Sequence, residues 1–177
     1  MSATIPDPRP SALGREAFVA RFGGIYEHSP WVAEAVWDAG LGTDLDDPER
    51  LAAAMARVVA TASPERKRAL VRAHPDLAGR AAIAGELTAS SRAEQKGAGL
   101  DACTPEEFRR FQALNAAYKA KFGFPFVIAV GGLGREEILA AFERRIGNDP
   151  DTEFGEALRQ IDRIAAIRLA AMSRPAA

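Results

Sequence analysis

The sequence predicts an all-α protein, a single compact multi-helix bundle with one buried extended segment. Apolar residues recur at three- and four-residue steps in several stretches, which is the spacing of one helix face. Alternation with a period of two, which is typical of half-buried strands, is nearly absent. A residue able to cap a helix also precedes a proline ahead of such stretches, at Ser29-Pro30, Asp47-Pro48, Ser63-Pro64 and Thr104-Pro105.

The clearest helix begins at Thr104. The run Thr104-Pro105-Glu106-Glu107 is a capping box, and the periodic residues after it end at Gly123, where a glycine commonly ends a helix. Two further amphipathic helices are expected over residues 51–62 and 138–146. A helix over residues 31–37 and a last one over residues 154–172 complete the bundle.

Residues 124–130 form the one strand-like stretch, a continuous apolar run after Gly123. No partner strand is evident in the sequence, and a single strand cannot satisfy its own backbone N–H and C=O groups. We therefore expect an extended segment buried among helices, whose spare backbone groups meet other protein groups or a ligand. This makes the segment a candidate wall of a binding site.

The composition favours one globular domain that binds a small ligand. The 177 residues are 47% hydrophobic, which suits one core, and we expect a domain over residues 11–174 behind a disordered lead-in at residues 1–10. A net charge of −1 argues against nucleic-acid binding. No apolar run is long enough to span a membrane, and we expect a cytoplasmic protein. One cysteine and two distant histidines support neither a disulfide framework nor a structural zinc site.

His74 is the candidate catalytic residue. Pro75 disfavours helical geometry in the residue before it, so His74 is expected at the end of the helix that begins near Pro64. Arg72 and Asp76 place charge on both sides, which favours a site that borders solvent or a cleft. Histidine is well suited to proton transfer near neutral pH. A surface or capping histidine is the simpler alternative.

A polar triad is expected on one face of a helix that begins near Thr88. Ser91, Glu94 and Gln95 stand at positions i, i+3 and i+4 and therefore share that face. A hydroxyl, a carboxylate and a carboxamide together match a flat ring that bears N–H and C=O groups. A solvated helix face is the alternative, because polar residues are common at this spacing.

Arg168 lies within the apolar stripe of the last predicted helix. The stripe runs through Phe154, Leu158, Ile161, Ala165 and Met172. An arginine on the core side of a helix needs an anionic or carbonyl partner. Arg168 can therefore anchor a substrate oxygen or form a structural salt bridge with a buried carboxylate.

Two other patterns give little support to a site. The turn at residues 130–134 has glycines ahead of a helix, but a dinucleotide fingerprint needs glycine where Glu137 stands, and no P-loop lysine follows. Cys103 has no histidine nearby in the sequence that would activate a thiolate.

Several separated motifs, in order from about residue 12 to residue 172, together resemble one family. They are Glu27-His28-Ser29-Pro30-Trp31, His74-Pro75-Asp76-Leu77, Leu87-Thr88 followed by Ser91-Arg92-Ala93-Glu94-Gln95 and Ala98-Gly99-Leu100, and Phe124-Pro125-Phe126-Val127-Ile128. The chain is similar to the OHCU decarboxylases of urate breakdown, which act on 2-oxo-4-hydroxy-4-carboxy-5-ureidoimidazoline (OHCU).

The resemblance implies an all-helical enzyme of purine catabolism that needs no cofactor or metal, releases carbon dioxide and (S)-allantoin, and forms a homodimer. It implies catalytic roles for His74, Glu94 and Arg168, with Pro75 lining the pocket. The substrate-binding residues would be Ser91, Arg92, Ala93, Glu94 and Gln95, together with backbone groups of Phe126, Val127, Ile128, Ala129 and Val130. Gly131-Gly132 departs from the family, where we expect a basic residue at the rim of the pocket.

Two alternatives from other functional classes stay open. A non-catalytic helical binding module would use Arg168 and residues 124–130 to recognise a peptide or protein, and it predicts an exposed apolar groove. A related ring-processing hydrolase would use His74 and Glu94 to activate water. Release of carbon dioxide separates decarboxylation from hydrolysis.

Overall fold

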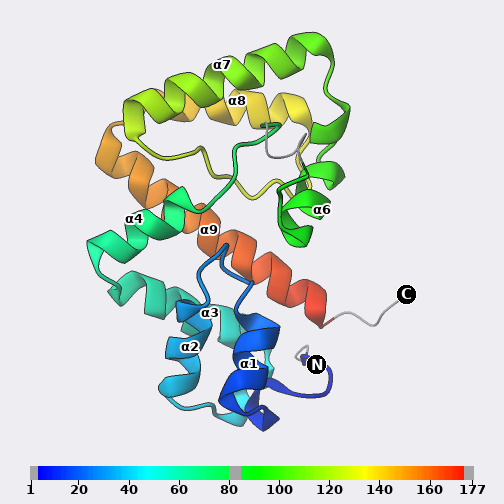
Figure 1. Cartoon of the computed structure of the whole chain (residues 1–177), viewed down its shortest axis with the longest axis vertical. Coiled ribbons are helices and arrows are strands. Elements are labelled where there is room, and N and C mark those ends of the chain that lie inside the picture. The colour runs from blue at the N-terminus through cyan, green and yellow to red at the C-terminus, as the bar shows by residue number, and fades with distance from the viewer. Residues whose placement is uncertain (1–3, 80–84, 174–177) are drawn as a thin grey trace. The chain divides into compact units, whose positions relative to one another are not determined.

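Helices are the only regular secondary structure in the residues that the structure, a computed structural model, describes: 4–79 and 85–173 (Figure 1). The predicted fold class is confirmed. The elements in chain order are η1 (Pro10–Ala12), α1 (Arg15–Phe22), α2 (Trp31–Asp38), η2 (Thr43–Asp46), α3 (Pro48–Thr61), α4 (Pro64–Arg72), α6 (Ala89–Gly97), η3 (Leu100–Ala102), α7 (Pro105–Phe122), α8 (Arg135–Arg145) and α9 (Pro150–Met172), where η marks a short 3-10 helix. Within the described ranges, no helix combines the length and the apolar character that crossing a membrane requires.

Side-chain caps fix where helices α3, α4, α6 and α7 begin. The side chains of Asp47 and Ser63 accept hydrogen bonds from backbone N–H groups in the first turns of α3 and α4, as the sequence predicted. Thr88 does the same for α6. Thr104 and Glu107 form the predicted capping box of α7, which ends at Gly123 in the left-handed conformation.

The predicted cap at Ser29 is wrong. Helix α2 begins at Trp31 after Pro30, and no side chain caps it. The Ser29 hydroxyl instead donates to the backbone carbonyl of Glu27 at 3.0 Å, across a turn in which His28 has a positive φ of 47°. The hydroxyl thus makes its hydrogen bond within this turn, and it accepts none from the N–H groups of the helix that follows.

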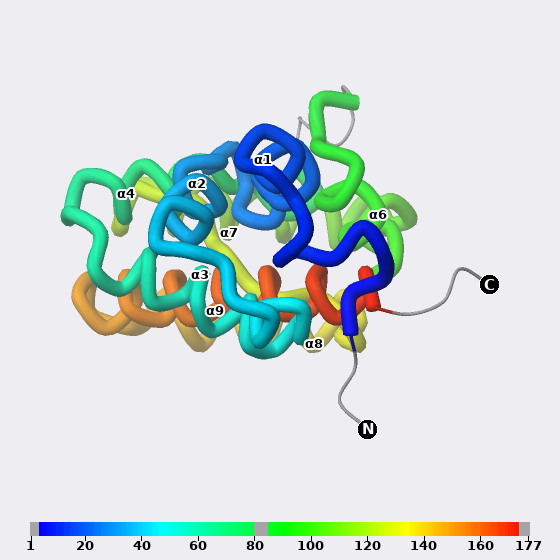
Figure 2. The backbone as a smooth tube through the Cα atoms, turned by 90° about the horizontal axis from the view of Figure 1, so that it is seen from below, coloured from blue at the N-terminus to red at the C-terminus, as the bar shows by residue number. Residues whose placement is uncertain are grey.

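The described chain divides into two compact units. The first spans Met1–Ala73 and Asp162–Ala177, and the second spans His74–Ile161, so that α9 begins in the second unit and ends in the first. In the first unit α2 packs against both α1 and α3, as Figure 2 shows. Its fully buried side chains include Phe18, Phe22, Leu51, Met55 and Leu70.

Residues 4–10 differ from the expected disordered lead-in. The side chain of Ile5 is fully buried, and its N–H donates to the carbonyl of Asp46 at 2.9 Å. Asp46 in turn accepts hydrogen bonds from the N–H and the hydroxyl of Ser11, both at 2.9 Å. The buried side chains of Ile5 and Pro10 and the hydrogen bonds between Ser11 and Asp46 thus hold the segment against η2, although its prolines and charges are typical of a disordered segment. Residues 1–3 of the lead-in lie outside the described residues.

The second unit has an aromatic core around residues 124–130. Helices α7 and α8 pack against each other (Figure 1) and direct Tyr118 and Phe142 toward Phe126. The rings of Phe126 and Phe142 stack with their centroids 3.9 Å apart, and the Tyr118 ring meets Phe126 edge-on at 5.3 Å. The segment is neither helix nor strand, and all of its side chains are buried except that of Ile128, which is half-buried. The predicted buried segment is confirmed.

The buried face of α9 is displaced from the predicted stripe. Ile161, Ala165 and Arg168 are buried as expected, but Phe154, Leu158 and Met172 are only partly buried. The residues that complete the buried face are Glu153, Ala157, Ile164 and Leu169. The displacement has a physical cause, because the Glu153 carboxylate accepts hydrogen bonds inside the second unit and turns its side of the helix inward.

Asp162, on the first-unit part of α9, gives a pH-dependent stability prediction. The Tyr26 hydroxyl donates to Asp162 Oδ1 at 2.8 Å, and burial raises the pKa of Asp162 in spite of this hydrogen bond. The folded protein therefore holds this proton more tightly than the unfolded chain does. The resulting stabilisation is fully present below the unfolded pKa and is lost as the pH rises through the folded pKa.

Asp162→Asn keeps an oxygen that can accept from Tyr26 and removes the buried charge. We expect its melting temperature to exceed that of the wild-type protein at pH 7, by about 2–4 °C for each kcal/mol gained. The advantage should shrink below about pH 4, where the carboxyl of the wild-type protein is protonated in both states. Thermal unfolding followed by circular dichroism at both pH values measures the difference, and an advantage that does not change with pH would contradict the prediction.

Candidate active site

His74 lies where the sequence places it, two residues beyond the end of α4. Helix α4 ends at Arg72, and Ala73 is its C-cap. The His74 side chain is only 9% exposed, so the alternative of a surface histidine is wrong. Of the charged flanking residues, Arg72 is exposed and Asp76 pairs with Lys119 at 2.6 Å. His74 is therefore a buried imidazole that is flanked in the sequence by two charged residues, Arg72 and Asp76.

The polar triad of α6 points mostly inward. Ser91 and Gln95 are each 5% exposed, and Glu94 is partly buried, so a fully solvated helix face is excluded. Arg92 and Ala93, which stand between them, are exposed. The Arg92 guanidinium donates to the carbonyls of Gly85 and Leu87, just ahead of its own helix.

Gln95 connects α6 with the segment that carries His74. Its Oε1 accepts from the N–H of Ala78 at 3.1 Å, and its Nε2 donates to the carbonyl of Asp76 at 3.3 Å. The structure thus brings two of the predicted site segments together within the second unit. The carboxamide of Gln95 is itself committed to backbone groups of residues 76–78.

Residues 126–130 belong to the same unit and are fixed by side chains at two points. The Arg145 guanidinium donates to the carbonyl of Val127 at 2.8 Å, and the N–H of Ala129 donates to Gln160 at 3.0 Å. Ile128 stands between these two attachments and keeps part of its surface exposed. The segment is therefore held in place on either side of its one accessible residue.

The sequence did not reveal a buried ionic network behind this segment. Arg145 Nη2 lies 2.6 Å from Glu153 Oε1, and their side chains are 6% and 0% exposed. Tyr118 also donates to Glu153 Oε1, and Asn148 donates to Oε2 at 2.8 Å. Burial raises the pKa of Tyr118, as does its hydrogen bond to Glu153, so the hydroxyl keeps its proton as a donor. The one signal in the sequence was the place of Glu153, four residues before Ala157 and eight before Ile161 on one helix face.

Arg168 is buried with a carboxylate partner in the first unit. Its Nη1 donates to Glu27 Oε2 at 3.1 Å and to the carbonyl of Ile25 at 3.1 Å, and the two side chains are 8% and 2% exposed. The anionic partner that an arginine on the core side requires is thus Glu27. Arg168 belongs to the first unit, whereas the other predicted site residues belong to the second.

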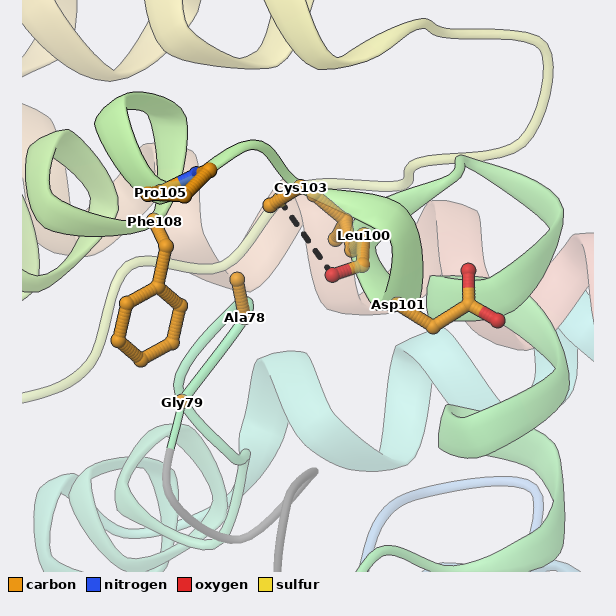
Figure 3. A pocket seen from close by; sticks show the side chains of 7 residues that line it. All are labelled: Ala78, Gly79, Leu100, Asp101, Cys103, Pro105 and Phe108. Atoms are coloured by element: carbon orange, nitrogen blue, oxygen red, sulfur yellow. Dashed lines mark hydrogen bonds between the residues drawn. The ribbon is translucent and has the colours of Figure 1, made fainter.

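A pocket of about 410 Å³ lies in the second unit, beside the turn of residues 76–79 that follows His74. Figure 3 shows the residues that line it. It is lined by Ala78, Gly79, Leu100, Asp101, Cys103, Pro105 and Phe108, none of which was a predicted site residue. The Cys103 thiol donates to the carbonyl of Leu100, and burial raises its pKa. A raised pKa disfavours the thiolate, in agreement with the weak support that the sequence gives to Cys103 as a nucleophile. Among the described residues, no group of three or more His, Cys, Asp or Glu side chains is arranged to hold a metal ion.

Comparison with known proteins agrees with the fold and the motifs. The sequence profile of the OHCU decarboxylases matches residues 11–170. A 2-oxo-4-hydroxy-4-carboxy-5-ureidoimidazoline decarboxylase of Haloferax volcanii is 44% identical over 158 residues, which cover 89% of this chain and 90% of the relative. The enzyme of the same name from Halalkalicoccus jeotgali is 41% identical over 161 residues, which cover 91% of this chain and 88% of the relative.

A solved structure shows the same fold. The crystal structure of an (S)-allantoin synthase matches 92% of this chain with a TM-score of 0.72 and 33% sequence identity. This chain spans about half of that protein, 52% of its length. Since both the profile and the relatives cover nearly all of the sequence that carries His74, Ser91–Gln95 and residues 124–130, the chain belongs to the OHCU decarboxylase family.

Proposed function

We propose that this chain decarboxylates OHCU to (S)-allantoin and carbon dioxide, with His74 as the proton donor. Membership of the OHCU decarboxylase family supports the reaction. The observation that carries the role of His74 is its position: a buried imidazole at the end of α4, in a segment that Gln95 joins to the polar face of α6. A buried histidine in a segment joined to a helix that carries hydroxyl, carboxylate and carboxamide groups is suited to proton transfer on a polar ring.

The reaction itself breaks one carbon–carbon bond and makes one carbon–hydrogen bond. The carboxylate leaves as carbon dioxide, and its bonding electrons remain on the ring carbon and spread into the adjacent C=N or C=O group. Hydrogen-bond donors aimed at the atom that receives this charge lower the barrier. His74 then delivers a proton to one face of the carbanion, which sets the configuration of the product.

The remaining predicted residues hold the ring while this happens. Ser91 and Glu94 present a hydroxyl and a carboxylate to the N–H and C=O groups of the substrate, and Gln95 stands beside them. Pro75, Arg92 and Ala93 border this region. Backbone groups of Phe126 through Val130 form the opposing wall, and Ile128 is best suited to meet a ligand because its neighbours are buried.

Arg168 has the proposed role of anchoring a substrate oxygen. Its Nη1 donates to Glu27 and to backbone carbonyls of Gly24 and Ile25, so the guanidinium is held in one place. A carboxylate behind an arginine fixes the direction of its planar fork, which favours bidentate binding of an anionic group. We also propose that the enzyme works in the cytoplasm as a homodimer and without a cofactor.

The assay for this function uses the purified protein and OHCU that is generated fresh by the preceding enzymes. We expect faster formation of (S)-allantoin than in buffer, followed by circular dichroism, together with one carbon dioxide for each allantoin. Treatment with a chelator should leave the rate unchanged, because no step requires a metal. Turnover without release of carbon dioxide would contradict decarboxylation and favour the ring-processing hydrolase. An unaltered spontaneous rate would favour the binding module.

A further inference from the structure

The turn after His74 receives side-chain hydrogen bonds at each of three consecutive residues. Asp76, Leu77 and Ala78 each present a backbone carbonyl to a carboxamide N–H. The donors are Gln95 to Asp76 at 3.3 Å, Asn115 to Leu77 at 2.9 Å and Gln112 to Ala78 at 2.8 Å. We call Gln95, Gln112 and Asn115 the amide clamp. The clamp draws on two helices, α6 and α7, and all of it lies within the second unit.

The clamped turn has a strained backbone conformation that other contacts must stabilise. Ala78 has a positive φ of 48°, a conformation that side-chain-bearing residues adopt rarely. A Cβ at Gly79 would lie 2.7 Å from the Cβ of Asp76, which shows how tightly the turn is closed. Gln95 Oε1 also accepts from the N–H of Ala78, so this strained residue is held through both its N–H and its carbonyl. Surrounding contacts must fix such a backbone, and strain of this kind is common beside functional residues.

Asn115 is a costly residue if packing is its only purpose. Its side chain is buried, and its Oδ1 has no hydrogen-bond partner among the described residues. An unsatisfied buried acceptor destabilises the folded protein, whereas an apolar side chain of similar shape would avoid that cost. What Asn115 supplies in return is a donor that reaches the carbonyl of Leu77. We therefore infer that Asn115 serves to hold the backbone of the turn and not to stabilise the core.

We propose that Gln112 and Asn115, together with Gln95, are positioning residues that hold residues 76–78 and thereby aim His74 at the substrate. The inference rests on the proposed function, because it requires His74 to transfer a proton. His74 is joined to Asp76 through Pro75 alone, whose ring fixes φ, so a shift of the clamped turn passes directly to the imidazole. The clamp touches backbone groups of the turn and acts on the reaction through His74.

The test removes one donor at a time and measures turnover and the environment of His74. Gln112→Met and Asn115→Leu keep the approximate size of each side chain but lose its N–H groups. We expect kcat to fall about 10- to 100-fold, because a misplacement near 1 Å has effects of this size, while KM changes less than about threefold. All rates are measured well below the melting temperature of each variant.

The two histidines of the chain provide a spectroscopic readout. His28 is exposed and lies in the first unit, so its ring C–H signal in a carbon–proton correlation spectrum is an internal reference for that of His74. We expect the His74 signal to shift or broaden in both variants while the His28 signal is unchanged. A loss of stability alone would not produce this selective change.

Lys121→Met is the matched control. Lys121 also lies on α7 and donates to two backbone carbonyls, those of Ile146 and Asn148, at 2.6 and 2.8 Å, but it does not touch the turn after His74. Its removal should leave kcat and the His74 signal unchanged. If Gln112→Met, at a half-buried position, keeps both kcat within about twofold and the wild-type His74 signal, the clamp proposal is overturned. The proposed function is tested separately. It is contradicted if the wild-type protein does not accelerate the formation of (S)-allantoin, or if His74→Asn forms (S)-allantoin at the wild-type rate.

Discussion

His74→Asn is expected to lower the rate of OHCU decarboxylation by about 10²- to 10⁴-fold while the protein remains folded. The substitution removes the group that delivers the proton, but asparagine keeps hydrogen-bonding capacity in a side chain that is 9% exposed. His74→Ala should lose turnover to a similar degree, with a greater loss of stability, because it also leaves a cavity. Circular dichroism follows (S)-allantoin from fresh OHCU, and the spontaneous rate is subtracted.

His28→Asn is the control for the loss of a histidine. His28 is exposed and belongs to the first unit, so its removal should leave turnover unchanged. Asparagine also suits the positive φ of 47° at this position. A His74→Asn enzyme that forms (S)-allantoin at the wild-type rate would remove His74 from the mechanism. A slow enzyme that gives allantoin of lower optical purity would support it, because the proton would then arrive from either face.

Local signals made most of the fold predictable from the sequence. The caps at Asp47, Ser63 and Thr104 act on N–H groups two or three residues away, so the residues that decide each helix start are neighbours in the chain. Ser29 shows the limit of this reasoning, since its hydroxyl donates to the carbonyl of Glu27 and does not accept from the first N–H groups of α2. Sequence spacing does not indicate whether a hydroxyl will accept from a nearby N–H group or donate to a nearby carbonyl.

The site was predictable where its residues are close in sequence and not where their partners are distant. The shared face of Ser91 and Gln95 follows from helix geometry, and both are buried. Gln112 and Asn115 had no such signal, because their partners are backbone carbonyls 34 and 38 residues away. A carboxamide on a helix looks the same in the sequence whether it meets water or a strained turn.

Arg168 shows why the sequence left two roles open. Its place on the buried face of α9 predicted an anionic partner, and the partner is Glu27, 141 residues away in the chain. The sequence around Glu27 resembles a family motif, but nothing in it indicates that this carboxylate is buried beside an arginine. A structural ion pair and a substrate anchor are compatible, because a carboxylate that holds a guanidinium also fixes the direction in which that planar group meets a ligand. The two roles can be separated by substitution.

Arg168→Ala is expected to lower both catalytic efficiency and stability. Loss of a charged hydrogen bond to the substrate should reduce kcat/KM by about 10- to 100-fold. Loss of its partner leaves Glu27, whose side chain is 2% exposed, as an uncompensated buried charge, which should cost about 3–5 kcal/mol of unfolding free energy. Steady-state kinetics and urea unfolding measure the two effects independently.

Glu27→Gln, alone and combined with Arg168→Ala, assigns each effect to its cause. Alone, it removes the ion pair but keeps the guanidinium, so stability should fall while kcat/KM stays within about tenfold of the wild-type value. In the double variant no buried charge is left unpaired, so part of the stability lost in Arg168→Ala should return. Its kcat/KM should remain as low as that of Arg168→Ala, because relief of the buried charge does not restore a donor to the substrate. Recovery of kcat/KM together with stability would instead make Arg168 a structural residue, whose only necessary partner is Glu27.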